Sequence, residues 1–247
     1  MGEAAEKRGK KMERLDKIIA NMGHATRREV KEMVRQGRVS VDGIVVSAAE
    51  MKIDPAAAEI QIDGMVLRYE NFTYLLLHKP AGVVSATEDT REKTVLDLLP
   101  AELRKRDLAP VGRLDKDTEG LLLLTNDGEL NHRLTGPRYH VEKTYYAEVD
   151  GCLEPADVTR FASGIALSDF TCLPAKLEIL TERSCRVTVQ EGKFHQVKRM
   201  LGFCGKPVIY LKRLSMGPLK LEETLPVGAF RPLTPQEVVS LREFVGL

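Results

Sequence analysis

The sequence predicts an α+β protein with two modules, a small basic one followed by a larger one built around a mixed sheet. Strand-like and helix-like segments alternate after residue 70 without the regular strand–helix–strand repeat of a parallel sheet. Before that point, hydrophobic periodicity is lost at residues 54–58, which places a linker between the two modules. A chain of 247 residues, 43% of them hydrophobic, is long enough to form two unequal cores.

Composition excludes several classes of protein. With 37 basic and 36 acidic residues the net charge is only +1, so any case for nucleic-acid binding must rest on local clusters of charge. The longest apolar runs are about four residues, which is too short to span a membrane. The polar residues 1–11 do not resemble a signal peptide, and we expect a disordered leader and a cytoplasmic protein. No C-x-x-C pair occurs among the cysteines, which argues against zinc and for reduced thiols: Cys152, Cys172, Cys185 and Cys204.

The small module begins with two predicted helices. The first has apolar residues at helical spacing and ends at Gly23: Leu15, Ile18, Ile19 and Met22. The second begins at Thr26, which forms a capping box with Glu29, and ends at Gly37. Residues 39–46 then predict a β-hairpin around Asp42-Gly43.

The second helix carries a basic face. Side chains that repeat every four residues lie on one face of a helix, and here they are Arg27, Lys31 and Arg35, with Arg28 beside them. Charge alone fits a solvated surface as well as a binding face. The order of elements over residues 12–58, however, resembles the S4 RNA-binding domain. That resemblance implies that these four side chains contact RNA phosphates, which supply affinity and position more than sequence choice.

The larger module is expected to follow a linker at residues 59–70 and to occupy residues 71–247. Within the linker, residues 60–64 read as a short strand and turn. Strands are predicted at residues 72–77, 121–125, 143–149, 175–180, 185–190 and 208–214. Helices are predicted at residues 154–163, 194–204 and 235–245.

A polar and glycine-rich stretch at residues 112–128 precedes and surrounds the apolar run Leu121 to Leu124, and three interpretations compete for it. A calcium loop starting at Asp115 should end in Glu, but its twelfth position is Asn126. An aspartyl-phosphate loop needs an apolar strand leading into Asp115, and residues 111–114 form a poor one. The third interpretation is a carboxylate that acts on a base without a metal.

Gly112-Arg-Leu-Asp115 resembles the signature of the pseudouridine synthases, and the resemblance covers nearly all of the chain after residue 12. It implies a mixed, mainly antiparallel central sheet with flanking helices, and no cofactor. It further implies that Asp115 is the nucleophile and that Arg113 fills the space left by a flipped-out uridine. Without the motif, Asp115 would read as a turn-capping aspartate. We expect Asp117 and Glu119 to be structural.

Two further motifs extend the resemblance. Residues 138–145 imply that Tyr145 stacks on the target base, although a buried core tyrosine is the alternative. Residues 191–201 imply that Lys198 pairs with the catalytic carboxylate, on a helix face shared with His195 and Arg199, which are candidate RNA contacts. From Gly192 to Leu221 there are seven basic residues and no acidic ones.

A third motif, at residues 78–85, resembles the first motif of the family. Its proline and glycine predict a rigid turn beside the site, and Lys79 is a candidate RNA contact.

An S4 module followed by these motifs implies a ribosomal RNA enzyme. Residues 138–145 and 170–178 resemble most the RsuA-type enzymes of 16S ribosomal RNA, which implies uridine 516 as the target. The alternatives are a large-subunit (23S) enzyme, a catalytically inactive S4-type ribosome-assembly protein, and a metal-dependent hydrolase. The expected partner is ribosomal RNA or a pre-ribosomal particle, with no membrane, small-molecule cofactor or metal involved, and the expected state is a monomer.

Overall fold

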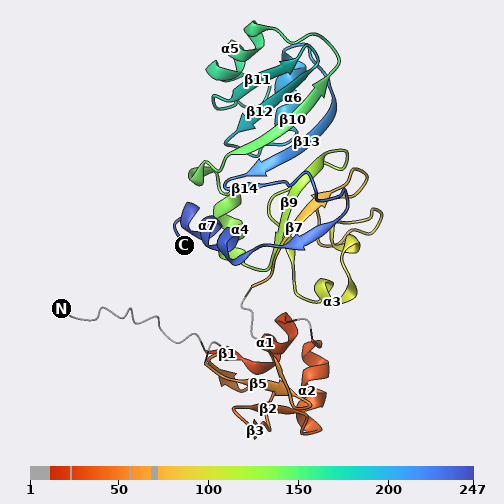
Figure 1. The fold of residues 1–247 in the computed structure, drawn as a ribbon, viewed down its shortest axis with the longest axis vertical. Helices are drawn as coiled ribbons and strands as arrows, with labels where there is room; N and C mark the ends of the chain where they lie inside the picture. Colours follow the sequence, from red (N-terminus) through yellow and green to blue (C-terminus); the bar gives the residue numbers. More distant parts are fainter. Residues whose placement is uncertain (1–11, 23, 56, 68–71) are drawn as a thin grey trace, which may run out of the picture. The chain divides into compact units, whose positions relative to one another are not determined.

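The computed structural model describes residues 12–22, 24–55, 57–67 and 72–247, and these form two compact units (Figure 1). The first unit comprises residues 12–67 together with 99–107, and the second comprises residues 72–98 and 108–247. The expected leader at residues 1–11 lies outside the described residues. Within the described ranges, no helix has the length and apolar character needed to cross a membrane.

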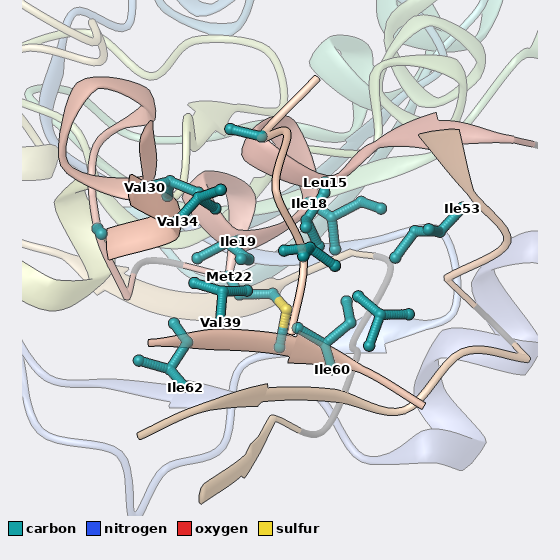
Figure 2. Close-up of a cluster of buried hydrophobic side chains, with 14 residues drawn as sticks. Leu15, Ile18, Ile19, Met22, Val30, Val34, Val39, Ile53, Ile60 and Ile62 are labelled. Carbon is teal, nitrogen blue, oxygen red and sulfur yellow. The ribbon is translucent and has the colours of Figure 1, made fainter. Parts of the chain in front are cut away.

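The first unit packs two helices on a small antiparallel sheet. Strand order in this sheet is β3-β2-β5-β6, and a separate two-stranded sheet joins β1 to β4. Apolar side chains of both helices meet those of β2 and β5 in one core (Figure 2). The elements are β1 (Glu13–Arg14), α1 (Leu15–Asn21), α2 (Arg27–Arg35), β2 (Val39–Val41), β3 (Ile44–Val45), β4 (Lys52–Ile53), β5 (Ile60–Ile62) and β6 (Met65–Leu67).

Local sequence signals in this unit are confirmed by the structure. Thr26 caps α2, and its reciprocal hydrogen bonds with Glu29 complete the predicted capping box. The hairpin of β2 and β3 turns at Asp42 and Gly43, whose φ angles of 51° and 77° belong to the two-residue turn that favours Asp-Gly.

The expected linker at residues 59–70 is wrong for its described part. β5 pairs with β2 and β6 pairs with β5, so residues 60–67 belong to the sheet of the first unit. The pairing buries Ile60 and Ile62 in the core. The sequence indicated a short strand there, but the pairing of β5 with β2 is a contact between residues about twenty positions apart, which local periodicity does not show.

The second unit is built on one mixed sheet, as predicted. Its order is β11-β12-β10-β13-β9-β7-β15, with β14 added beside β13 and β8 beside β9. Every pairing is antiparallel except that of β9 with β13. The strands are β7 (Tyr74–Lys79), β8 (Ala109–Pro110), β9 (Glu119–Thr125), β10 (Lys143–Val149), β11 (Lys176–Thr181), β12 (Ser184–Val189), β13 (Val208–Met216), β14 (Leu219–Lys220) and β15 (Phe230–Pro232).

Helices flank this sheet. Figure 1 shows α4 and α7 side by side against the half that contains β7 and β9, where their buried leucines join one apolar cluster. The apolar run of β9 is fully buried, as expected for the strand at the centre of the unit. The helical segments of the chain after residue 72 are η1 (Leu96–Leu98), α3 (Ala101–Arg104), α4 (Gly128–Thr135), η2 (Pro137–Tyr139), α5 (Pro155–Ser163), α6 (Gln196–Phe203) and α7 (Pro235–Phe244).

The predicted helix at 194–204 begins two residues late, and α4 was not predicted at all. His195 has a φ of 49°, a left-handed conformation that cannot continue an α-helix, so α6 starts at Gln196. α4 begins at Gly128 and is capped by Asp127, whose side chain accepts a hydrogen bond from the backbone of Leu130. A glycine start and a length of about two turns gave it little periodicity to read.

The parallel pairing of β9 with β13 joins the two halves of the large sheet. It comprises only two residue pairs, one of them Gly120 with Arg213. The φ of Gly120 is 110°, and a Cβ at this position would overlap the backbone of Arg213. The strands therefore approach closely because residue 120 has no side chain. The Arg213 side chain is buried and donates from Nε to the carbonyl oxygen of Leu121, 2.7 Å away.

Gly120→Ala is expected to lower the free energy of unfolding by about 3 kcal/mol, because the added methyl group forces β9 away from β13. Urea unfolding at equilibrium measures the change. Gly128→Ala is the matched control, since a Cβ there meets no atom within 4 Å and lies in a helix. We expect the control to leave stability unchanged or to raise it by up to about 1 kcal/mol. Equal effects of the two substitutions would contradict this account of the strand junction.

Candidate active site

A buried ammonium group holds the loop that carries Asp115. Lys79, at the end of β7, has no exposed surface. Its Nζ lies within hydrogen-bonding distance of four carbonyl oxygens, which share its three N–H groups, at 3.0 Å from Pro80, 3.0 Å from Asp115, 3.3 Å from Lys116 and 2.8 Å from Thr118. Three of these carbonyls belong to the loop before β9, so a single cation fixes the backbone on both sides of Asp115.

The expectation that Lys79 contacts RNA is therefore wrong. Its side chain is turned inward and is fully used by backbone carbonyls. Burial lowers the pKa of the Lys79 ammonium to about 8, while the carboxylates of Asp117, Asp115 and Glu119 oppose this change. Near neutral pH the group is still protonated and can donate three hydrogen bonds.

The rest of the same motif also anchors the loop, as the predicted rigid turn requires. The hydroxyl of Ser85 donates to the carbonyl oxygen of Leu114 at 2.8 Å and accepts from the Leu114 amide at 3.1 Å. The amide of Gly82 donates to the carbonyl oxygen of Lys116 at 2.7 Å. The backbone of residues 114–118 is thus held by partners that lie 29 or more positions earlier in the chain.

A second lysine binds the carboxylate itself. Lys198, on α6, lies 3.0 Å from Oδ2 of Asp115 and 2.5 Å from Oδ1 of Asp117. Burial lowers the pKa of Lys198, but hydrogen bonds to Asp117 and Asp115 outweigh it and the net pKa is raised. The same hydrogen bond from Lys198 lowers the pKa of Asp117. The side chain of Asp115 is 27% exposed, so it is a carboxylate in a cleft and not a buried one.

His195 forms the other flank of the carboxylate. Its Nε2 lies 3.5 Å from Oδ1 of Asp115, and its ring stacks on that of Phe194 with centroids 3.8 Å apart. The left-handed backbone of His195 is an uncommon conformation for a residue with a side chain, and it sits beside the reactive group. His195 was expected on the face of a helix, but it precedes α6 as the capping residue.

These groups open into one cleft. Its lining includes Asp115, Lys198, Arg113 and Tyr145. Tyr145, on β10, is only 9% exposed and contributes its surface to the wall of the cleft. Arg113 is exposed at the rim. The structure thus brings together four residues that are spread over 85 positions of the sequence, from Arg113 to Lys198.

Other candidate residues lie outside this arrangement. Arg199 pairs with Asp169 and lies over the ring of Phe170, 4.9 Å from its centroid, so its guanidinium already has protein partners. The four basic candidates of the first unit are exposed on α2. Of these, Lys31 lies 2.7 Å from Glu50 and Arg35 lies 3.1 Å from Glu32.

Two residues of the site were not predicted. The buried Gln196 donates from Nε2 to Glu191 at 3.0 Å and accepts from the Lys193 amide at 3.2 Å, which shapes the turn before α6. A signal was available, because Gln196 lies four residues before Met200 on the apolar face of that helix. Asp117 was expected to be structural, yet it shares Lys198 with Asp115.

The arrangement suits nucleophilic work on a ring that enters the cleft. A carboxylate held by an ammonium group can attack an electrophilic carbon. A tyrosine ring on the wall offers a surface on which a planar base can stack. Among the described residues, no group of three or more His, Cys, Asp and Glu side chains is arranged to hold a metal ion.

Comparison with known proteins decides the family. Residues 73–202, which contain Asp115, Tyr145 and Lys198, match the RNA pseudouridylate synthase family, and residues 13–57 match the S4 domain. The chain belongs to the RNA pseudouridylate synthase family. It is accordingly an isomerase that acts on RNA, with an S4 domain before its synthase domain.

This pseudouridine synthase resembles several proteins over nearly its whole length. An uncharacterized RNA pseudouridine synthase of Bacillus subtilis is 44% identical, over 93% of this chain and 98% of that protein. The ribosomal small subunit pseudouridine synthase A of Pseudomonas aeruginosa is 41% identical, over 92% and 100%. The ribosomal large subunit pseudouridine synthase B of Bacillus subtilis is 39% identical, over 94% and 96%. A solved pseudouridylate synthase superposes with a TM-score of 0.66 at 37% identity, over 93% of this chain and 99% of that one.

Lys79→Met is expected to lower both stability and turnover, because the four carbonyls lose their donor while the side chain keeps most of its length. We expect a loss of about 2–4 kcal/mol in the free energy of unfolding at pH 7. Lys116→Met is the matched control, since Lys116 pairs with Glu92 at the surface, and its loss should stay below about 1 kcal/mol. Urea unfolding and single-turnover rates measure the two effects.

A comparison of the wild type with Lys79→Met at several pH values tests the pKa of Lys79. The folded protein is expected to release this proton near pH 8, whereas the unfolded chain keeps it to the ordinary value of 10.5. Between these pH values the unfolded state binds more protons, so the stability of the wild type relative to Lys79→Met should rise with pH, by at most about 1.4 kcal/mol per unit. A difference that stays flat from pH 7 to 10 would show that the carbonyls keep the pKa at its ordinary value.

Proposed function

We propose that this enzyme converts uridine 516 of 16S ribosomal RNA to pseudouridine, with Asp115 as the nucleophile. The observation that carries the proposal is the position of the Asp115 carboxylate, which lies in a cleft 3.0 Å from the Lys198 ammonium with Tyr145 on the wall. The proposed state is a monomer that acts in the cytoplasm on ribosomal RNA or on a pre-ribosomal particle.

The reaction breaks the C–N glycosidic bond of uridine, turns the base over and forms a C–C bond to the same sugar. Nothing is oxidised, reduced or added, and one proton moves from the base carbon to the ring nitrogen that is set free. The carboxylate of Asp115, attacking the sugar or the base, keeps the fragments attached to the enzyme while the base turns. Lys198 holds and orients this carboxylate through their ion pair, and the ring of Tyr145 supports the base by stacking.

The target must leave its stack before it can reach Asp115. Extrusion of a base costs a few kcal/mol, and less where the RNA is unpaired or distorted. The exposed guanidinium of Arg113 lies at the rim of the cleft, where it can occupy the space that the uridine leaves and bind the neighbouring phosphates. In this proposal Arg113 therefore lowers the cost of extrusion and does not take part in bond breaking.

The choice of 16S RNA rests on the similarity to the small-subunit enzyme of Pseudomonas aeruginosa and on residues 138–145 and 170–178. The second candidate is a large-subunit target, because the large subunit enzyme of Bacillus subtilis is nearly as similar, at 39% against 41% identity. Mapping of pseudouridines in both ribosomal RNAs, from cells with and without the gene, separates the two. Loss of the signal at uridine 516 alone supports the proposal, and loss in 23S RNA supports the second candidate.

Asp115→Asn is expected to lower the rate of pseudouridine formation by about 10³-fold or more, because the amide is not a nucleophile. RNA affinity should change by less than about threefold. Asp117→Asn is the matched control: Asp117 also binds Lys198, but its side chain is 76% exposed, and we expect only about a tenfold loss. Turnover of the Asp115→Asn variant at the wild-type rate would refute the assignment of Asp115 as the nucleophile, whereas absence of turnover in the wild type itself would favour an inactive RNA-binding scaffold.

Charge reversal on α2 is expected to weaken RNA binding and leave the chemical step nearly unchanged. We expect the double variant Arg27→Glu/Lys31→Glu to bind RNA less tightly and to reduce the slope of log K against log salt by about 0.7–0.9 for every phosphate that these side chains neutralise in the wild type. The control is Lys17→Glu/Lys52→Glu, which changes the net charge equally elsewhere in the first unit. Equal effects of both variants would assign the change to net charge and not to the α2 face. Fluorescence anisotropy at several salt concentrations, with single-turnover rates at saturating enzyme, measures both.

A further inference from the structure

Phe194 is a large apolar side chain that the protein leaves uncovered next to its reactive carboxylate. It is 70% exposed. One face of its ring is stacked on His195, with centroids 3.8 Å apart and planes 18° apart. Since His195 in turn lies 3.5 Å from Asp115, the exposed ring is tied through one side chain to the nucleophile.

The space in front of Asp115 is divided into two adjoining compartments. The first is lined by Tyr145 and Lys198, and the second is lined by Phe194 and Lys116. Residues 113–115 and 192–193 and His195 border both. Each compartment thus has one aromatic side chain of its own, and Asp115 lies where they meet. The first is the compartment that the proposed reaction assigns to the reacting base, and the second is left without an occupant in that reaction.

We propose that Phe194, stacked on His195, binds the base of a nucleotide directly adjacent to the target uridine. This inference rests on the proposed function, because it assigns the second compartment to the same RNA strand. When the uridine is extruded, a neighbouring base loses its stacking partner, and an aromatic ring at the edge of the cleft replaces that partner. The exposed face of Phe194 provides a stacking surface that accepts any base.

Charge around the second compartment favours a nucleotide over an apolar peptide. The side chains of Arg113, Lys116 and Lys193 line this space, and the acidic side chains beside them are those of Asp89, Asp115 and Asp117. Asp115 and Asp117 both pair with Lys198 and Lys116 pairs with Glu92, which leaves Arg113 and Lys193 as the cations of the compartment that are not engaged by these carboxylates. Phosphates flank every base of an RNA strand, so a ring bordered by cations matches a stacked nucleotide.

The backbone at this point fixes how the ring is presented. His195 has a left-handed conformation and precedes the first residue of α6. The chain therefore turns between Phe194 and the helix, and this turn presents residues 194 and 195 as a stacked pair ahead of α6. A ring that is already supported on one face loses little freedom when a base stacks on the other face.

The test compares binding of short single-stranded RNAs in which one uridine lies between adenosines. Affinity is measured by fluorescence anisotropy for the wild type and for Phe194→Ala, Phe194→Leu and Phe194→Tyr. Removal of the stacking surface is expected to weaken binding about tenfold in the alanine and leucine variants, and tyrosine should retain the wild-type affinity. Leucine separates stacking from simple apolar contact, because it keeps most of the apolar volume and lacks the ring.

Companion RNAs identify the bound base. In these, the adenosine on one side of the uridine, or on the other, is replaced by an abasic ribose. One of the two replacements should weaken binding by the wild type about tenfold and abolish its advantage over Phe194→Ala. Equal affinities of wild type and Phe194→Leu, or failure of the wild type to distinguish adenosine from the abasic site on either side, overturns the proposal. Phe194 is exposed, so an unchanged urea midpoint is expected and shows that each variant is folded.

The same preparations are assayed for pseudouridine in ribosomal RNA, which separates this inference from the proposed function. If the wild type forms pseudouridine and Phe194 variants bind all RNAs alike, the stacking site is wrong while the enzyme assignment stands. If the stacking dependence appears but no pseudouridine forms in either ribosomal RNA, the nucleotide site stands and the proposed function is wrong. A protein segment as the occupant of the second compartment predicts no effect of Phe194 on RNA affinity, and so is excluded by the expected result.

Discussion

The buried ammonium of Lys79 is the constraint on which the active site depends. Four carbonyl oxygens converge on it, and three of them belong to the loop that presents Asp115. Burial disfavours a cation in this place and lowers its pKa to about 8, and the backbone acceptors around its N–H groups offset part of that cost, so the ammonium persists near neutral pH. The position of the Asp115 carboxylate is thereby set by main-chain atoms and by a lysine that is buried from solvent.

The two lysines of the site divide the work by what they bind. Lys79 binds backbone from inside the fold, whereas Lys198 binds the side chains of Asp115 and Asp117 from the side of the cleft. Burial lowers the pKa of Lys79 to about 8, which leaves its ammonium protonated near neutral pH and able to donate hydrogen bonds. Lys198 has its pKa raised, because its hydrogen bonds to Asp117 and Asp115 outweigh the effect of burial. Exchanging either lysine for a neutral residue therefore damages the site by a different physical route.

Local signals in the sequence predicted most of the fold and the candidate site residues. The capping box at Thr26 and the run of β9 are short-range patterns, and the structure has both. The companions of Asp115 came from motif resemblance, and the structure brings them to one cleft. Three features could not be predicted from the sequence, and the reason is the same for each. The inward turn of Lys79, the pairing of β5 with β2 and the left-handed backbone of His195 are set by contacts between distant segments, which no local pattern encodes.

The short parallel junction of β9 and β13 is reinforced by polar side chains of the cleft. Asp115 shortly precedes β9, while Lys198 leads by α6 into β13, so their ion pair crosses the same seam as Tyr210 with Glu119 and Arg213 with Leu121. These polar interactions join two antiparallel half-sheets whose shared ladder is only two residue pairs long. The ion pair of Asp115 with Lys198 therefore also helps to hold the two half-sheets together. Any bending along this seam would pull the Asp115 carboxylate away from the Lys198 ammonium, so the geometry of the cleft depends on the rigidity of the sheet.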